Sequence, residues 1–340
     1  MKNAPLVRHA ITNHRKTSAF LHNWLLTLAA LVALSSGSTV VRAQELVGDA
    51  DWAIFVSQRS GATELYLLDI STRQVSQLTE TGRAHLTPAV ANGAKMLAYA
   101  SREGSSYEIF TAQLNSSWRT RRPLLAAVNR LTYNPIDEVS PSISGDGAKV
   151  TFASEKGIEI MSGVGDSRRV LVGRTANSFD YAPAISPDGS QVAFVSNRGG
   201  SNEIWLVATQ TGQTRQLTRG GAALGGISWS ADSSRIVFTT SATASKLSGI
   251  AMSDIADGSF RVLTEGNDGE AAISPGGMYV LFTSLRDGDP ELYMLSLRTG
   301  SVQRLTSNPG VDGSAVFVNL PSAPIRRMPA PGRGVQSDKE

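Results

Sequence analysis

Short apolar stretches alternate with polar residues throughout residues 51–320. In six of these stretches an aromatic residue is followed two places later by Ser or Thr, and the intervals between successive aromatic residues are 44, 53, 42, 44 and 44. A sequence period in the forties is typical of β-propellers, in which each repeat forms one blade. The six aromatic residues are Phe55, Tyr99, Phe152, Phe194, Phe238 and Phe282.

The fourth repeat shows most clearly how many strands a blade should contain. Its apolar segments are PAIS (183–186), QVAFVS (191–196), EIWLV (203–207) and RQLT (215–218). Ser-Pro-Asp-Gly at 186–189 separates the first two segments, and these residue types in this order favour a type I turn. We therefore predict four antiparallel strands in each blade.

Two further patterns recur in step with the aromatic residues. The third segment starts with Glu and two apolar residues in five repeats, whereas the remaining copy has Gly249. We align Glu64, Glu108, Glu159, Glu203 and Glu291 with one another. The fourth segment carries Leu-Thr at Leu78, Leu131, Leu217, Leu263 and Leu305, with Leu171-Val172 as a variant. Patterns that repeat equally in every blade favour a role in folding.

The two ends of the repeat region are complementary. The chain enters at a second segment, WAIFVS (52–57), and leaves at a first segment, SAVF (314–317). If these two pair, they complete one blade and the ring has no open seam. We predict an all-β fold, a six-bladed β-propeller of four-stranded antiparallel blades over residues 51–320, closed by the C-terminal strand joining the N-terminal blade.

The regions outside the repeats have different compositions. Residues 1–43 combine basic residues, an apolar run at 24–34 and the sequence Val-Arg-Ala, which is typical of a secretory signal peptide. A retained membrane anchor is the alternative, although a run of this length is short for a membrane span. Residues 44–50 would be a short linker, and the Pro-rich residues 321–340 a disordered tail. We therefore expect an exported protein of the periplasm, with no membrane span after cleavage.

Charge and residue types narrow the function. Residues 1–43 hold five basic and no acidic residues, so that the rest of the chain has 27 basic and 29 acidic residues. This balance does not favour nucleic-acid binding. The chain has no Cys, and His85 is the one His outside residues 1–43, which excludes a Cys nucleophile and a His-Cys metal site. We expect no catalytic residue, no resident metal and no cofactor.

Carboxylates remain as candidate binding groups. Six places before the end of the first segment stand His85, Glu138, Asp180 and Asp268; Leu224 interrupts the series, and Asp312 is placed one residue out of register. These residues should surround one mouth of the propeller channel. Two interpretations are open: the acids fix their loops, or they bind a cation such as Ca²⁺ or a Lys or Arg of a partner.

The repeat SPDGSQVAFVSNRGGSNEIWLVATQTGQTRQLT (186–218) resembles that of the TolB family, the periplasmic propeller proteins of the Tol-Pal envelope system. The resemblance implies a non-enzymatic, monomeric docking module whose channel mouth receives a peptidoglycan-associated lipoprotein or a Tol component. By this resemblance the residues of the docking mouth would be His85, Glu138, Asp180, Asp268 and Asp312, with the neighbouring Arg102, Arg198 and Arg286. TolB proteins have an α/β domain ahead of the propeller, whereas about seven residues separate Ala43 from Asp51 here.

Two other functions are compatible with the sequence. A carboxylate-only protein that binds or cleaves glycans could use the same mouth, with Tyr181 as its main stacking platform, although few aromatic residues stand near these loops. The propeller could also derive from the gate of a prolyl oligopeptidase-like enzyme. The extra residues of the second repeat, around Trp118, Arg119, Arg121 and Arg122, are either a solvated insertion or a dock for an acidic partner or RNA.

Overall fold

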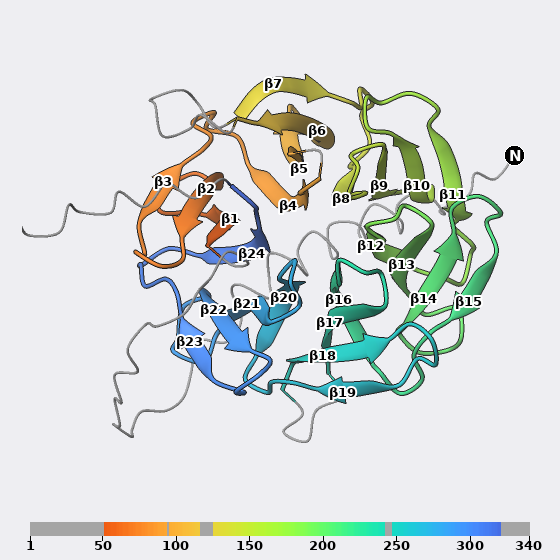
Figure 1. Ribbon diagram of the computed structural model, residues 1–340. Coiled ribbons are helices and arrows are strands. Elements are labelled where there is room, and N and C mark those ends of the chain that lie inside the picture. The colour runs from red at the N-terminus through yellow and green to blue at the C-terminus, as the bar shows by residue number, and fades with distance from the viewer. Residues whose placement is uncertain (1–50, 94, 116–124, 242–246, 321–340) are drawn as a thin grey trace, which may run out of the picture.

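The computed structural model describes residues 51–93, 95–115, 125–241 and 247–320. These residues form six four-stranded sheets arranged as the blades of a ring, shown in Figure 1. Every pair of neighbouring strands within a sheet is antiparallel. The six-bladed propeller expected from the repeats is therefore confirmed.

Each blade contributes one strand to each of four concentric positions (Figure 1). The innermost strands are β4 (His85–Ala91), β8 (Val139–Ile143), β12 (Asp180–Ile185), β16 (Ala223–Trp229), β20 (Asp268–Ile273) and β24 (Asp312–Phe317). The second strands are β1 (Trp52–Ser57), β5 (Met96–Glu103), β9 (Lys149–Ser154), β13 (Gln191–Ser196), β17 (Arg235–Thr240) and β21 (Tyr279–Ser284). The third strands are β2 (Glu64–Asp69), β6 (Ser106–Leu114), β10 (Gly157–Ser162), β14 (Glu203–Ala208), β18 (Gly249–Asp254) and β22 (Glu291–Ser296). The outer strands are β3 (Val75–Gln77), β7 (Leu125–Arg130), β11 (Arg169–Gly173), β15 (Thr214–Gln216), β19 (Phe260–Val262) and β23 (Val302–Arg304).

We number the blades in chain order, so that blade 1 contains β1, β2, β3 and the closing strand β24. In this blade Ile54 of β1 pairs with Val316 of β24, and Ala53 pairs with Phe317. The last strand of the ring thus completes the sheet that the first strands begin, as the sequence predicts. This pairing removes the open seam between blades 1 and 6.

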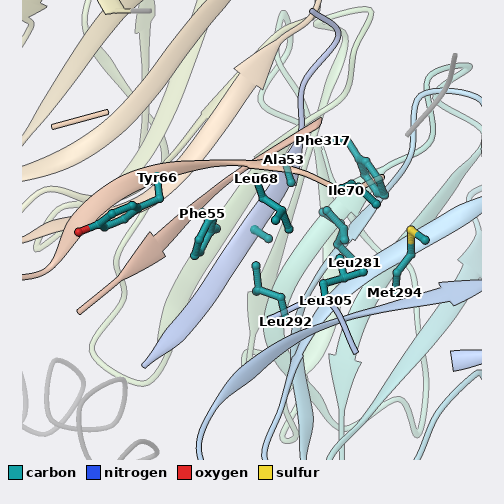
Figure 2. Packing of buried hydrophobic residues seen from close by; sticks show 12 residues of the cluster. Ala53, Phe55, Tyr66, Leu68, Ile70, Leu281, Leu292, Met294, Leu305 and Phe317 are labelled. Atoms are coloured by element: carbon teal, nitrogen blue, oxygen red, sulfur yellow. The ribbon is translucent and has the colours of Figure 1, made fainter. Parts of the chain in front are cut away.

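The hydrophobic core is divided among the six interfaces between blades. Each of six clusters of buried side chains joins two neighbouring blades. Figure 2 shows the cluster at the seam, where Phe55 and Phe317 of blade 1 pack in one cluster with Leu281 and Leu292 of blade 6. Five of the repeated aromatic residues are fully buried, and Tyr99 is 3% exposed. A blade therefore buries its apolar faces only when both of its neighbours are present.

The repeated Leu-Thr pair has a structural explanation. In five blades the Thr hydroxyl oxygen accepts a hydrogen bond from a backbone N–H of the third strand, at 2.9–3.1 Å. In three of these blades the same hydroxyl donates to the repeated Glu, as Thr218 does to Glu203 at 2.6 Å. The buried Glu203 also accepts the backbone N–H groups of Gly220 and Gly221. These polar repeats therefore hold the outer half of five blades together.

The alignment of Glu159 with the other repeated Glu residues is wrong by two positions. Gly157 pairs with Ser154, which is the place that Glu64 takes opposite Ser57 in blade 1. Glu159 instead lies opposite Phe152, where blade 1 has an aromatic residue. The error arises because the turn between β9 and β10 has only two residues, Glu155 and Lys156.

Two assignments near the innermost strands also change. Asp312 pairs with Ser57 just as Asp268 pairs with Ser284, so that Asp312 is in register with the other acids. In blade 5 Ala223, and not Leu224, pairs with Thr240 at this position, because an additional irregularity between Ala223 and Gly225 inserts one residue.

Several predicted segments lie outside the described residues. These are the signal peptide (1–43), the linker (44–50), the tail (321–340) and the Trp118–Arg122 part of the insertion. Across the residues that the structure does describe, no helix has the length and apolar content needed to cross a membrane.

Candidate binding face

All the site residues predicted from the sequence lie at one end of the ring, which we call the loop face. It consists of the hairpin loops 58–63, 104–105, 155–156, 197–202 and 285–290, with the described residues 241 and 247–248 of the β17–β18 hairpin. The blade connections 78–84, 131–138, 174–179, 217–222, 263–267 and 305–311 complete it. The innermost strands run parallel to one another around the axis, so that all of them begin at this face. His85, Asp180, Asp268 and Asp312 are the first residues of their strands, and Glu138 directly precedes β8.

Three of the acids are held in the same way, each by an arginine from its own blade. Arg198 donates to Asp180 at 2.8 Å, and its Nε donates to the hydroxyl of Ser196 at 2.9 Å. The guanidinium lies 5.3 Å from the centroid of the Phe194 ring and 5.4 Å from that of Trp205. Arg286 holds Asp268 and Arg59 holds Asp312 with the same geometry. We call this arrangement the acid–arginine clamp.

The clamps leave the acids and the arginines with different access to solvent. The side chains of Asp180, Asp268 and Asp312 have no exposed surface, whereas the arginines are 22–29% exposed. Burying a carboxylate is tolerable here because each one receives charged hydrogen bonds. A partner at this face would therefore meet the edges of the guanidinium groups and not the predicted ring of carboxylates.

Blade 3 builds an equivalent clamp from a different part of the chain. Its tight β9–β10 turn has no arginine, and Arg168, which precedes β11, lies 5.0 Å from the centroid of the Phe152 ring. Arg168 donates to Glu138 and, at 2.8 Å, to Glu159. Burial alone would raise the pKa of Glu159, but hydrogen bonds from Arg168 and Ser154 lower it below its ordinary value. The misaligned Glu159 thus serves as a second acid of this clamp.

Blade 2 has no clamp of this kind. His85 is buried, with its Nε2 2.7 Å from the Thr81 hydroxyl and 3.2 Å from Glu64 Oε2. Burial lowers the pKa of His85, although the nearby Glu64 acts in the opposite direction. Glu103 takes the place of the clamp arginine, two residues after Ser101, and it pairs with Arg83.

Arg102 and Tyr181 lie at the loop face but take no part in the clamps. The side chain of Arg102 is exposed, forms no ion pair with a described residue and donates to the carbonyl of Gly104 at 3.4 Å. Tyr181 is half-buried against blade 5, and its hydroxyl accepts a hydrogen bond from Asn202. Burial raises the pKa of Tyr181 to about 12. Neither residue joins the clamps.

A backbone position with positive φ follows His85 and each of the four acids by two residues, and in blade 5 it follows Ala223 by three. There the innermost strand bulges, and the φ angles are 47° at Thr87, 53° at Ser140, 50° at Ala182, 58° at Gly226, 54° at Glu270 and 51° at Ser314. Five of the six are not glycine, although this left-handed region costs other residues about 1 kcal/mol or more. Glu270 also joins blades, since it accepts the N–H of Ser314 at 2.7 Å.

Sequence reasoning missed several residues of the loop face. Arg59 could have been found, because it follows the Ser of its aromatic-x-Ser pair by two places, as Arg198 and Arg286 do. Arg168 carries no such signal, since it comes from another connection. Tyr133 and Phe179 are 72% and 44% exposed on the connections that lead into blades 3 and 4. Their exposure depends on the folding of two loops and is not visible in the residue pattern.

The described residues contain no cluster of three or more His, Asp or Glu side chains placed to hold a metal ion. A Ca²⁺ ion at this face would have to compete with the guanidinium groups for Glu138, Asp180, Asp268 and Asp312.

Comparison with known proteins agrees with the six-bladed geometry. Residues 160–288 match the family model of the TolB beta propeller domain. The propeller is TolB-like. TolB from Acinetobacter baumannii matches it with a TM-score of 0.67 at 21% sequence identity, over 80% of this chain and 69% of that one. A putative TolB from Agrobacterium tumefaciens matches with a TM-score of 0.59 at 21% identity, over 81% of this chain and 94% of that one. The resemblance expected from the repeats is confirmed, and at this identity the solved structures establish the fold.

The fold of the TolB-like propeller also occurs in enzymes. An oligogalacturonate lyase in complex with manganese matches with a TM-score of 0.51 at 16% identity, over 73% of this chain and 86% of that one. No curated protein sequence matches the chain. The fold alone therefore does not decide between binding and catalysis.

Proposed function

We propose that this chain is a non-catalytic, protein-binding propeller of the periplasm that presents its loop face to a component of the cell envelope. The observation that carries the proposal is the loop face of a TolB-like propeller, ordered from within by four acid–arginine clamps. Loops that are held in place before binding lose less conformational entropy when a partner docks. The leader-like composition of residues 1–43 supports the periplasmic location.

The geometry supports glycan cleavage less well. Glycoside hydrolysis needs one carboxyl group that gives a proton and another that attacks or activates water. The side chains of Glu138, Asp180, Asp268 and Asp312 are fully buried, and each is paired with an arginine. None of these four therefore offers a free proton donor at the surface.

The absence of cysteine from the chain allows a direct test of the loop face. Ser60→Cys places one thiol on an exposed hairpin loop of this face, and Thr211→Cys places one on an exposed turn at the opposite end of the ring. Each variant is labelled with a large polyethylene glycol maleimide, and capture of the purified peptidoglycan-associated lipoprotein of the same organism is measured. We expect the adduct at position 60 to abolish capture and the adduct at 211 to leave it unchanged.

Equal capture by both labelled variants would reject the loop face as the interface. Failure of the unlabelled protein to capture either this lipoprotein or the soluble domains of the Tol proteins would reject the proposed function itself. Circular dichroism of both labelled variants verifies that the sheets are intact.

A further inference from the structure

Two aromatic side chains stand out on one side of the loop face. Large exposed apolar side chains in the described residues are mostly aliphatic, and Tyr133 and Phe179 are the aromatic ones among them. They lie on consecutive blade connections, 131–138 and 174–179, on either side of the short hairpin turn of blade 3. Exposed Pro135 and half-buried Ile136 extend the apolar surface beside Tyr133. Apolar surface gathered in this way is typical of a contact site.

Each of the two rings has a guanidinium against it. Arg130 lies 4.6 Å from the centroid of Tyr133, and Arg174 lies 5.2 Å from the centroid of Phe179. Arg130 also pairs with Glu108, at 3.1 Å, whereas Arg174 forms no ion pair with a described residue. The stacked guanidinium of Arg174 therefore keeps its N–H edge free for carboxylates. Tyr and Arg are also the residue types that contribute most to binding energy at protein interfaces.

The connection that bears Tyr133 is fixed by the clamp of blade 3. Asn134 donates to Glu138 at 2.7 Å and accepts the backbone N–H of Ile136 at 3.1 Å. The hydroxyl of Tyr133 donates to the carbonyl of Arg130 at 2.9 Å. Glu138, predicted from the sequence as a contact residue, is therefore a positioning residue for an exposed ring.

The connection that bears Phe179 is fixed in a similar way. The backbone N–H of Phe179 donates to Asn197 at 2.8 Å, on the hairpin loop that also carries the clamp residue Arg198. The neighbouring Ser178, which forms a hydrogen bond with Thr175 at 2.6 Å, is buried. Both aromatic side chains are thus presented on loops that need little rearrangement on binding.

The charge around these rings is mainly positive. Four exposed cations that form no ion pair with a described residue lie on blades 2, 3 and 4 of this face: Arg102, Lys156, Arg174 and Arg219. Glu155 is the exposed acid among them, next to Lys156. On blade 6 of the same face the exposed charges include Asp287 and Asp289. The face is therefore divided into a basic, aromatic sector and a sector that bears acids.

From these observations we propose that the sector around Tyr133 and Phe179 binds a protein segment that combines acidic and large apolar side chains. The proposal rests on the proposed function and names the chemistry of its partner. The apolar side chains of the segment would cover Tyr133, Ile136 and Phe179, while its carboxylates would meet Arg174 and Lys156. An acidic glycan would satisfy the cations but leave the apolar surface at Ile136 and Pro135 without partners.

The test uses the full protein and three probes of defined chemistry. The first is a labelled peptide in which Glu alternates with Leu and Phe, the second replaces each Glu by Lys, and the third is oligogalacturonate. Binding is measured by fluorescence anisotropy, and by competition for the oligosaccharide. We expect the acidic peptide alone to bind, with an affinity that falls as salt is raised.

Variants then locate the site. Tyr133→Ala with Phe179→Ala should weaken binding of the acidic peptide by about thirtyfold or more, as expected for anchor residues of an interface. Arg174→Glu with Lys156→Glu should abolish it. Val128→Ala with Val302→Ala removes exposed apolar side chains from the outer strands β7 and β23, and should change the affinity less than about twofold. Thermal unfolding of each variant shows whether its fold is retained.

Several results would overturn the proposal. Among them are equal binding of the acidic and basic peptides, preferential binding of oligogalacturonate, and equal losses in the aromatic and control variants. Capture of the envelope lipoprotein separates this proposal from the proposed function. If the adduct at position 60 blocks capture while the aromatic double variant captures like the wild type, the sector is wrong and the loop face stands.

Discussion

At the scale of single residues, the innermost strands combine strain with burial. Five non-glycine residues take the left-handed conformation at the bulge that follows each clamp position, and Gly226 does so in blade 5. The side chains of the clamp acids, two residues before four of them, lie fully buried. Strained residues persist where the surrounding structure determines them, and here the pairing of each innermost strand within its sheet does so.

The strain at Ala182 can be measured by comparison with Ala184 of the same strand. Ala182 has a φ of 50°, and glycine adopts this conformation without steric cost. Ala184 is 4% exposed and is not among the positive-φ residues. Glycine there would only increase the conformational entropy of the unfolded chain and remove a buried methyl group. We expect Ala184→Gly to lower the free energy of unfolding by about 1 kcal/mol more than Ala182→Gly. Chemical denaturation measures the difference, and equal effects would show that the bulge is unstrained.

Because of His85, we expect the stability of the fold to depend on pH in a defined pH range. Its pKa is lowered from 6.5 by burial in the folded protein, so that the unfolded chain binds a proton more readily. The contribution of neutral His85 is therefore fully present above pH 6.5 and is lost as the pH falls through this value towards the folded pKa. The slope is at most about 1.4 kcal/mol per pH unit. Carboxylates such as Asp232, whose pKa is lowered to about 2, reduce the stability of the fold only at lower pH.

The measurement is the free energy of unfolding between about pH 7.5 and pH 5 for the wild type and His85→Gln. Gln retains a polar group opposite Thr81 and Glu64 but does not titrate. The wild type should lose stability on acidification while the variant stays nearly level. Parallel curves for the two proteins would assign the dependence to other groups.

At the scale of the element, polar groups at the loop end hold strands of a blade together. In five blades a Thr hydroxyl joins the third and outer strands, and in four blades a clamp joins the innermost strand to the rest of the blade. Blade 3 shows that the arrangement matters more than the sequence position, because Arg168 reaches the place of the missing loop arginine. The geometry that recurs in these blades is a buried acid, a guanidinium bound to it and an aromatic ring against the guanidinium.

The clamp predicts unequal effects for two arginines of the loop face. Arg198→Met leaves Asp180 buried without its charged partner, and we expect it to lower the free energy of unfolding by about 3 kcal/mol. Arg102→Met removes an exposed side chain without an ion pair to a described residue, and should cost less than about 0.5 kcal/mol. Adding Asp180→Asn to Arg198→Met should restore part of the loss, because it removes the buried charge. Equal losses for Arg198→Met and Arg102→Met would contradict the clamp.

At the scale of the whole molecule, stability depends on closure of the ring. Every hydrophobic cluster spans two blades, and the cluster of Figure 2 includes Ala315 and Phe317 of the closing strand. Without β24, strand β1 would expose an unpaired edge and blade 6 would lose part of its apolar cover. Closure therefore joins all six interfaces into one cooperative unit.

Truncation tests this dependence. A chain that ends at residue 311 lacks β24, and we expect its free energy of unfolding to fall by more than about 3 kcal/mol, with faster proteolysis within blade 1. A chain that ends at Leu320 retains β24 and serves as the control, which should unfold like the full protein. Unchanged unfolding of the shorter chain would show that the seam contributes little.

Much of this architecture could be predicted from the residues alone. The regular spacing of aromatic residues such as Phe55, Phe194 and Phe282 predicts the number of blades. The segments WAIFVS and SAVF predict how the ring closes. Both predictions succeed because these patterns reflect local strand length and alternation. The register of Glu159 could not be predicted, since a hairpin turn shorter by a few residues shifts every later position of its blade. Asp312 and Leu224 were assigned to wrong positions for a related reason, because residue spacing does not show local irregularities of the strands.

The sequence thus determined which residues repeat, whereas the tertiary structure decided which of them a partner can reach. The identical spacing of Glu138, Asp180 and Asp268 predicted a ring of ligands. In the folded protein each carboxylate is buried against a guanidinium, because an unpaired charge in the interior is too unfavourable. Tyr133 and Phe179 have no repeat to mark them. They are exposed because folding holds the connections that carry them. Glu138, which accepts a hydrogen bond from Asn134, is paired with the distant Arg168, and the N–H of Phe179 donates to Asn197.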